Sequence, residues 1–257
     1  MEFKGHINLR ISIFNTGKLT ISSKGKDKDF ICHEYYYSDY KLIKHIDFIN
    51  WKVSQHTYNE NGERIELRTF SFDENPESSE LDGYKKFEYV KGNLISENHF
   101  IIIGKEEKLE YEGKFTYSEK ELVREDFHYS NEIYTIEYKF NKKKNILTKV
   151  FPNNDGKCQY HYDENGFLTK FINFKGNNYC QINEYNYRNN RLEKLIEYPI
   201  LKFKKSLFSG NIKLLEKEPF IHENEFFYDD NGILIKELKT DILNNHEIDV
   251  LEYEYKK

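Results

Sequence analysis

A short pattern recurs along this chain of 257 residues and restricts its possible folds more than any other feature of the sequence. The two best copies span residues 159–170 (QYHYDENGFLTK) and 225–236 (EFFYDDNGILIK) and agree almost position by position. In each copy we call the aromatic residue before Asp, Tyr162 or Tyr228, the anchor. Weaker copies have their anchors at Phe14, Tyr37, Tyr58, Tyr89, Tyr117, Phe140 and Tyr187. The chain is therefore predicted to be a repeat protein.

Each unit has the pattern of a β-hairpin. Aromatic residues stand at the anchor and two positions before it, with a polar residue between them, which is typical of a half-buried strand. After the anchor, Asp or Asn and then Gly suit the positive φ angles of a hairpin turn, and a second run opens with Leu or Ile. The chain also has no alanine but 21 Tyr and 20 Phe, which favours strands over helices.

The units together predict an all-β fold, a repetitive array of about nine antiparallel β-hairpins in one domain over residues 1–257. Open sheets of more than about ten strands usually curl or split. The roughly 18 strands of such an array should therefore form a curled, coiled or partly closed sheet.

The chain resembles the YD-repeat (Rhs-type) family, whose units carry a Tyr-Asp step, a Gly turn and a following Arg or Lys before Leu. The segments 159–170 and 225–236 carry this likeness in detail, through Tyr162-Asp163 and Tyr228-Asp229, although Phe or Ile follows the turn Gly there. Over most of the chain, only the spacing of the repeat matches that of the family. The resemblance implies a β-hairpin array, and a weak link to toxin systems, because very large members of the family build shells around a toxin domain.

The step from Tyr187 to Tyr228 is the longest between anchors and contains an irregular insertion at about 199–222. Its basic and apolar residues alternate between two prolines, which predicts a protruding loop or a short helix. Binding residues often concentrate in such insertions on a rigid scaffold, whereas the alternative is a tolerated surface excursion. The predicted partner-binding residues are Lys202, Phe203, Lys204, Lys205, Leu207 and Phe208.

No motif in the sequence indicates catalysis, a cofactor or a metal. Cys158 and His161 have the spacing of a metal-ligand pair, but an offset of three in a strand sends them to opposite faces, and no second pair follows. The three cysteines are odd in number and widely spaced, so we expect buried thiols rather than a disulfide framework. The Asp-x-Asn-Gly segments lack the closing Glu of a calcium loop, and no phosphate-binding glycine motif is present.

Charged residues also follow the repeat. Glutamates stand three residues before several anchors, and lysines stand two residues after the Leu that follows the turn. The glutamates are Glu34, Glu137, Glu184, Glu225 and Glu252, and the lysines are Lys44, Lys170, Lys194 and Lys236. We expect these columns to neutralise each other across strands on a solvated face, although a register error of one residue would reverse that assignment.

These features favour a non-enzymatic protein-binding module, most concretely a cytosolic immunity protein that neutralises a cognate bacterial toxin. The alternatives are a YD-repeat-like protein that binds carbohydrate or the cell envelope, and, third, a hydrolase with its site in the sheet groove. The start of the sequence lacks a secretory signal and no window is apolar enough for a membrane span, so we expect a cytoplasmic protein. A pI near 6.0 with interspersed charges argues against a nucleic-acid partner. The oligomeric state stays open.

Overall fold

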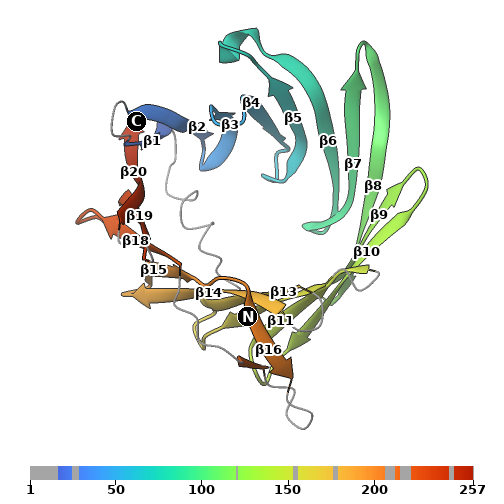
Figure 1. Ribbon diagram of the computed structural model, residues 1–257. Helices are drawn as coiled ribbons and strands as arrows, with labels where there is room; N and C mark the ends of the chain where they lie inside the picture. The colour runs from blue at the N-terminus through green and yellow to red at the C-terminus, as the bar shows by residue number, and fades with distance from the viewer. Residues whose placement is uncertain are drawn as a thin grey trace. The chain divides into compact units, whose positions relative to one another are not determined.

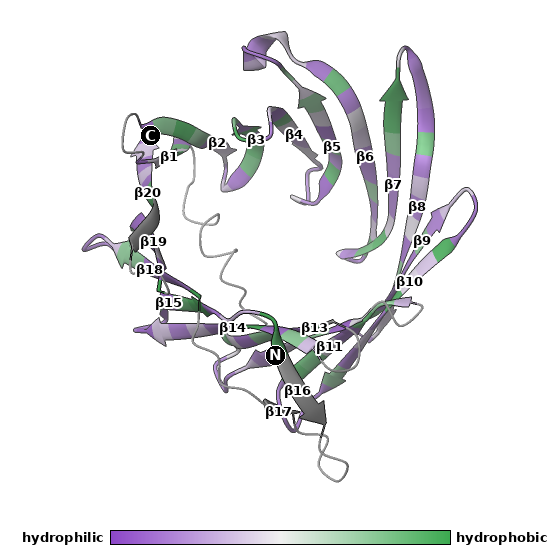
Figure 2. Ribbon diagram, viewed as in Figure 1, coloured by the Kyte–Doolittle hydropathy of each residue, from purple (hydrophilic) through white to green (hydrophobic). Residues whose placement is uncertain are grey.

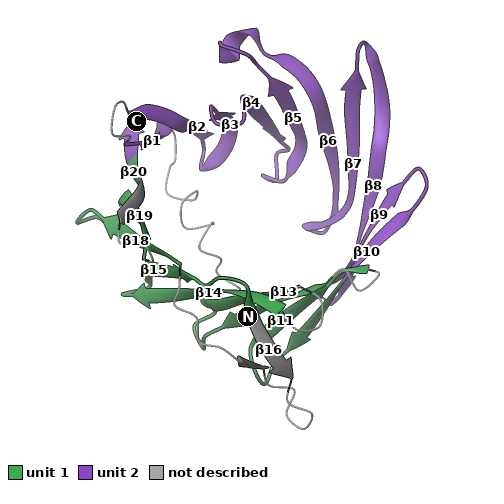
Figure 3. Ribbon diagram, in the orientation of Figure 1, with its two compact units in different colours: residues 1–10, 137–252 green, residues 11–136, 253–257 purple. Residues whose placement is uncertain are grey.

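The computed structural model describes residues 17–24, 29–119, 121–152, 156–175, 179–205, 212–214, 221–242 and 246–256. These residues form 20 β-strands and one 3-10 turn, Pro76–Ser78, and contain no α-helix. The predicted all-β array of antiparallel hairpins is therefore confirmed. The chain divides into two compact units, unit 1 with residues 1–10 and 137–252, and unit 2 with residues 11–136 and 253–257 (Figure 3).

Within unit 2, successive strands pair antiparallel, each with the next along the chain, and the sheet curves rather than lying flat (Figure 1). The strands are β1 (Gly17–Ser23), β2 (Phe30–Ser38), β3 (Lys41–Asp47), β4 (Lys52–Tyr58), β5 (Arg64–Ser71), β6 (Glu80–Val90), β7 (Asn93–Ile103), β8 (Glu106–Ser118) and β9 (Glu121–Tyr129). Hydrophilic and hydrophobic residues alternate along strands such as β8, as half-buried strands require (Figure 2).

Unit 1 has the same antiparallel order, with one departure: β15 pairs with β18, and of the two strands between them β16 pairs with both β14 and β17. Its strands are β11 (Ile146–Val150), β12 (Lys157–Tyr162), β13 (Leu168–Lys175), β14 (Tyr179–Arg188), β15 (Arg191–Glu197), β16 (Leu201–Lys205), β17 (Ile212–Leu214), β18 (His222–Tyr228) and β19 (Leu234–Asp241). β10 (Ile133–Asn141) and β20 (His246–Lys256) carry residues of both units. No helix of the described residues is long and apolar enough to cross a membrane.

The repeat appears in the structure as a recurring β-bulge. In seven hairpins the anchor tyrosine pairs with a residue at or next to the start of the second strand. The residue that follows this partner has no partner of its own. For example, Tyr37 pairs with Leu42, and Ile43 is unpaired. The anchor pairs with Leu in six of them and with Arg64 in the seventh. The unpaired residues are Ile43, Ile65, Ile95, Val123, Thr169, Glu193 and Ile235. A bulge at a fixed position increases the local twist of each hairpin.

The longer turns share one hydrogen-bond pattern. At residues 163–167 the Asp163 carboxylate accepts from the amides of Asn165 (2.9 Å) and Phe167 (2.8 Å), and Gly166 adopts a φ of 82°. The turns at residues 59–63 and 229–233 repeat the contact from the first to the fifth residue, at 2.9 and 2.7 Å. An Asx side chain that closes the turn and a glycine with positive φ explain the Asp-x-Asn-Gly sequence without calcium.

Neighbouring hairpins are joined by side chains where their strands stop pairing. The Tyr58 hydroxyl donates to the Leu42 carbonyl at 2.9 Å, and the Tyr228 hydroxyl donates to the Leu192 carbonyl at 2.7 Å. Arg191 places its guanidinium carbon 5.7 Å from the centre of the Tyr228 ring. These contacts connect two of the anchors to the Leu of the preceding hairpin.

Gly232→Ala is expected to lower the free energy of unfolding by about 2 kcal/mol, because the left-handed conformation costs about 1 kcal/mol and the new methyl group displaces the Arg191 guanidinium, a contact worth about 1 kcal/mol. A Cβ atom at Gly232 would lie 2.3 Å from the Arg191 Cζ atom. Gly92 is the matched control, because its φ of 80° is the same but no atom lies within 4 Å of a Cβ there. Urea unfolding of both variants measures the difference; equal losses would contradict the role given to Arg191.

The charged columns follow the predicted register in unit 1. Lys170 lies opposite Glu184 with its Nζ atom 2.6 Å from the carboxylate, and Lys236 lies opposite Glu252. Lys194 is opposite Glu225, 3.6 Å away, and also contacts Glu223 at 2.7 Å. Each exposed pair contributes less than about 1 kcal/mol.

Lys44 departs from this arrangement, because the register sets it between Tyr36 and Gln55 and its ammonium lies 5.6 Å from the centre of the Tyr36 ring. In the first described hairpin the carboxylate of Glu34 is instead contacted by Lys18 at 2.5 Å.

Candidate functional site

In the insertion, residues 201–205 and 212–214 form strands, and residues 206–211 and 215–220, which belong to the segment predicted as a loop or a short helix, lie outside the described residues. β16 pairs with β17 in register, with Phe203 opposite Leu214, Lys204 opposite Lys213 and Lys205 opposite Ile212. We call β16 and β17 the arm. Of the six predicted partner-binding residues, Lys202, Phe203, Lys204 and Lys205 lie on β16, whereas Leu207 and Phe208 lie outside the described residues.

The arm starts from the sheet itself. β15 and β16 pair with the same edge of β14, with Asn183 opposite Glu197 and Cys180 opposite Leu201, so the ladder continues past Pro199 with one extra residue. Pro199 lacks a donor, and a bulge is one of the few places where a sheet accepts it. The repeat pattern of the sequence is interrupted at this point, but the strand keeps its direction.

A buried cluster holds the base of the arm. Leu201 is 2% exposed and packs with Ile172, Phe174, Cys180 and Ile182, all of them nearly inaccessible to water. Cys180 and Ile182 lie on β14, which pairs with β16, and Ile172 and Phe174 lie on β13, which pairs with the other edge of β14. The first residue of the arm is therefore fixed by the hydrophobic core of unit 1.

Like charges oppose each other along the arm. Lys204 and Lys213 are at directly opposed positions in the register of β16 and β17. Opposed like charges destabilise a pair of strands, so an acidic ligand at these positions would remove an unfavourable interaction.

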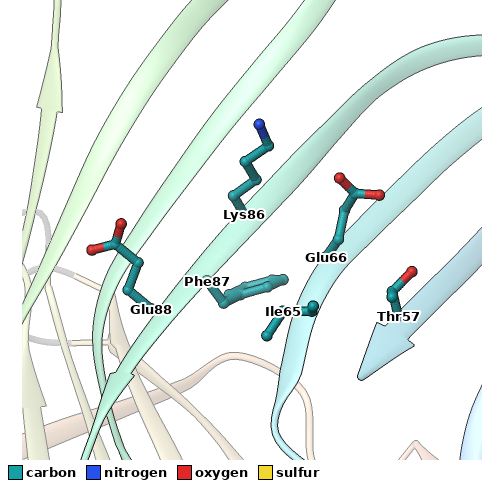
Figure 4. Close-up of a pocket in the computed structure, with 6 residues that line it drawn as sticks. All are labelled: Thr57, Ile65, Glu66, Lys86, Phe87 and Glu88. Carbon is teal, nitrogen blue, oxygen red and sulfur yellow. The ribbon is translucent and has the colours of Figure 1, made fainter. Parts of the chain in front are cut away.

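A second candidate is a pocket of about 340 Å³ in unit 2, between β5 and β6 (Figure 4). Its lining residues are Thr57, Ile65, Glu66, Lys86, Phe87 and Glu88. Figure 4 shows Phe87 and Ile65 beside each other, with the charged ends of Lys86, Glu66 and Glu88 extending to one side. No local sequence pattern indicates this site, because its opening depends on how far two hairpins separate.

A cluster of polar groups spans β6, β7 and β8 in unit 2. Lys85 Nζ donates to Glu97 Oε1 (2.7 Å) and to the Tyr111 hydroxyl (2.6 Å), and that hydroxyl donates to Glu97 Oε1 (2.5 Å). Burial and the hydrogen bond to Glu97 raise the pKa of Tyr111. Because each of the three groups is bonded to the other two, the cluster joins three strands.

Three histidines lie on the neighbouring strands β2, β3 and β4. His33 Nδ1 is 3.3 Å from His45 Nε2, and the Tyr35 ring stacks on His45 at 4.3 Å. Burial lowers the pKa of all three, to about 4 for His45 and for His56. The rings are therefore neutral at pH 7. Among the residues described, no three side chains form a group that could hold a metal ion.

All three cysteines are buried, as the sequence predicted. Burial raises the pKa of the Cys158 and Cys180 thiols, which keeps them protonated at neutral pH. Cys158 contacts Asn173 Oδ1 at 3.6 Å and lies on β12 three residues from His161, so the two are on opposite faces. This excludes the pair as joint ligands of one metal ion.

No family model and no curated protein matches this sequence. Among solved structures, TcdB2-TccC3 is 13% identical with a TM-score of 0.39, and the match covers 93% of this chain and 15% of that chain. A porin-like protein from Bacteroides uniformis is 11% identical with a TM-score of 0.35, covering 95% of this chain and 98% of the other. A putative 6-phosphogluconolactonase from Bacteroides fragilis is 9% identical with a TM-score of 0.26, at 95% and 98% coverage. This chain thus spans about one seventh of the TcdB2-TccC3 chain, and likeness at this level says nothing of activity.

Proposed function

We propose that this chain is a non-enzymatic protein-binding module whose arm contacts an acidic surface of a protein partner. The opposed lysines Lys204 and Lys213 carry this proposal. A hairpin with like charges at opposed positions is less stable alone than with a ligand of opposite charge, and charge complementarity steers and orients protein association. The buried base at Leu201 supports the same function, since an anchored arm loses less conformational freedom on binding.

The most concrete form of the proposal is a cytoplasmic immunity protein of a bacterium, which neutralises a cognate toxin domain by covering it. The resemblance to YD repeats motivates this form by analogy. Protein interfaces of standard size need about 800 Å² from each partner, and a β-hairpin array with a projecting arm suits such a contact.

Carbohydrate binding is the second candidate, and it would need accessible aromatic rings. Some rings of the repeat are unavailable, because Tyr37 is 2% exposed, Phe87 5% and Phe226 6%. The other described anchors are half-buried. Stacking of sugar rings would therefore be limited to the accessible edges of those anchors.

The double variant K204E/K213E is expected to weaken the complex about tenfold, because it reverses the charge that faces the partner. It keeps like charges at the opposed positions, so the arm itself should be no less stable. K108E/K143E is the control with the same change in net charge, since both lysines are exposed and lie outside the arm. The measurement is co-purification with the product of the neighbouring reading frame, followed by titration calorimetry.

Growth rescue tests the immunity form directly. Co-expression of this chain should restore growth of cells that produce the neighbouring protein, and K204E/K213E should reduce that rescue while the control does not. Absence of any complex and of any rescue would refute the immunity proposal. Equal affinity of both double variants would instead show that the arm is not the contact.

A further inference from the structure

The connection between β3 and β4 in unit 2 presents two large apolar side chains to water. We call residues 48–51 the tryptophan turn. Ile49 is 55% exposed and Trp51 is 49% exposed. Trp51 also has a φ of 57°, in the left-handed region, where a bulky residue is strained. Strain of this kind persists only where the surrounding contacts enforce it, and it gathers at functional sites.

Hydrogen bonds hold the tryptophan turn in place. The Asp47 carboxylate accepts from the backbone amides of the second and third residues after it, each at 3.0 Å. The Phe48 amide donates to the Cys32 carbonyl of β2 at 2.9 Å, and the Phe72 amide donates to the Trp51 carbonyl at 3.1 Å. The turn is thus fixed to the chain on both sides of it, so it loses little conformational freedom when a partner binds.

The Trp51 ring stands on the hydrophobic core of unit 2. Its centre is 5.6 Å from that of the Phe72 ring, with the two planes at 65°. Phe72 is 5% exposed and packs with Ile46 and Val53. One part of the indole is therefore held by buried side chains, and the exposed part is open to a partner. Tryptophan is among the residues that contribute most to protein interfaces.

The segment beside the tryptophan turn is strongly acidic. Residues 72–83 contain five carboxylates and no lysine, arginine or histidine. Asp82 is paired with Lys52, whose Nζ atom is 2.6 Å away. The other four carboxylates are exposed and have no ion-pair partner among the residues described; they belong to Asp73, Glu74, Glu77 and Glu80.

The neighbouring cations do not neutralise this charge. Lys52 is the only lysine or arginine of residues 47–52, and Asp82 already engages it. His33 lies 3.6 Å from Asp47 but is neutral at pH 7, because burial lowers its pKa. The turn between β7 and β8, residues 104–107, adds one lysine and two glutamates. An excess of negative charge therefore surrounds the exposed indole.

We infer that the tryptophan turn and residues 73–80 together bind a basic segment of a protein partner. An arginine or lysine of that segment would stack on the exposed part of the Trp51 ring, because tryptophan attracts cations more strongly than the other aromatic rings. Its basic neighbours would face the unpaired carboxylates, and Ile49 would contact an apolar residue between them. The inference rests on the proposed protein-binding function and adds a contact whose charge is opposite to that of the arm.

The test uses the full chain and a short peptide, acetyl-Arg-Gly-Arg-amide. Trp51 is the only tryptophan of the chain, so its fluorescence reports on this site alone. We expect a saturable change of the emission, and about fivefold weaker binding of the uncharged acetyl-Gln-Gly-Gln-amide. Equal binding of the two peptides, or no change with either, would overturn the inference. Tighter binding of maltose than of the basic peptide would assign the ring to a sugar and would refute it as well.

A pair of double variants tests the carboxylates. E74Q/E77Q should weaken binding of the basic peptide about threefold, because it removes two charges beside the indole. E60Q/E88Q is the matched control, since it removes two exposed carboxylates of unit 2 that lie outside the site. Equal weakening by both would show attraction to the net charge of the protein only, against the inference.

The ring itself is tested by W51L, which should weaken binding of the basic peptide about fivefold. Calorimetry measures this, because the variant has no tryptophan. Y40L is the control, since Tyr40 is 64% exposed and has a φ of 59° in another turn. Unchanged binding in W51L would contradict the inference. The peptide needs no partner protein, and K204E/K213E should bind it as the unsubstituted chain does, so a failure here is distinct from a failure of the arm.

Discussion

Leu201→Ala is expected to lower the free energy of unfolding by about 3 kcal/mol, and Ile200→Ala, one residue earlier, by less than about 0.5 kcal/mol. Leu201 is 2% exposed, whereas Ile200 is 52% exposed. Truncation at Leu201 removes apolar contacts and leaves a cavity against Ile172, Phe174 and Ile182. Because Ile200 is the adjacent residue, the comparison isolates the loss of buried side-chain contacts from effects on the backbone at this place.

Urea unfolding followed by circular dichroism gives both values. The result also decides how the arm can be removed, because replacing residues 200–216 by a Gly-Ser linker would delete Leu201 and destabilise unit 1 together with the arm. A replacement that starts at residue 202 keeps the core intact. If L201A and I200A lower the free energy of unfolding equally, the buried cluster does not hold the arm. The proposed role of the arm as an anchored contact would then lose its basis.

The features that the sequence predicted well are those set within one hairpin or between adjacent hairpins of regular spacing. Tyr162 lies opposite Leu168, and Lys170 lies opposite Glu184, because short turns determine the register and the side-chain period of two then repeats it. Buried thiols were predicted from the odd number and wide spacing of the cysteines. The strand type and the turns needed no long-range information.

The features that the sequence missed depend on interruptions of this pattern. Pro199 indicates a break, but the bulge absorbs it and the strand continues as the arm. The pocket depends on how far β5 and β6 separate after Ile65, which no local pattern encodes. Lys85, Glu97 and Tyr111 meet only because the register shifts between His99 and Phe100, so their contact could not be read from spacing alone.

Lowering the pH from 7 to 4.5 is expected to reduce the free energy of unfolding by about 3 kcal/mol through His45 and His56 together. Their folded pKa of about 4 lies below the ordinary histidine value of 6.5, so the unfolded chain takes up protons between these values and the folded chain does not. The stability is therefore complete above pH 6.5 and is lost as the pH falls toward 4. The full difference between folded and unfolded pKa would change the free energy of unfolding by about 3 kcal/mol for each histidine. We take about half of that value because both rings are partly in contact with water.

The surroundings of the histidines explain why protonation is unfavourable. Burial is the main cause for both rings; His33 adds a second imidazole beside His45, and Arg64 a permanent charge near His56. Asp47 is the one anion whose charge favours protonation of these histidines, and it acts on His33 and His45. Its own lowered pKa means that its contribution is lost only below pH 4, outside the interval considered.

His56→Phe should remove about half of this acid sensitivity and should not destabilise the protein at pH 7. His56 occupies the position two residues before an anchor, where Phe87 and Phe226 stand in other hairpins, and its buried Nδ1 atom has no hydrogen-bond partner. Gln55→Leu, at an exposed site on the other face of β4, is the control, because it leaves all three histidines in place. Urea unfolding of the three proteins between pH 7 and 4.5 measures the slopes. An unchanged slope in H56F would show that His56 does not contribute to the acid sensitivity, since a phenyl ring takes up no proton at any pH.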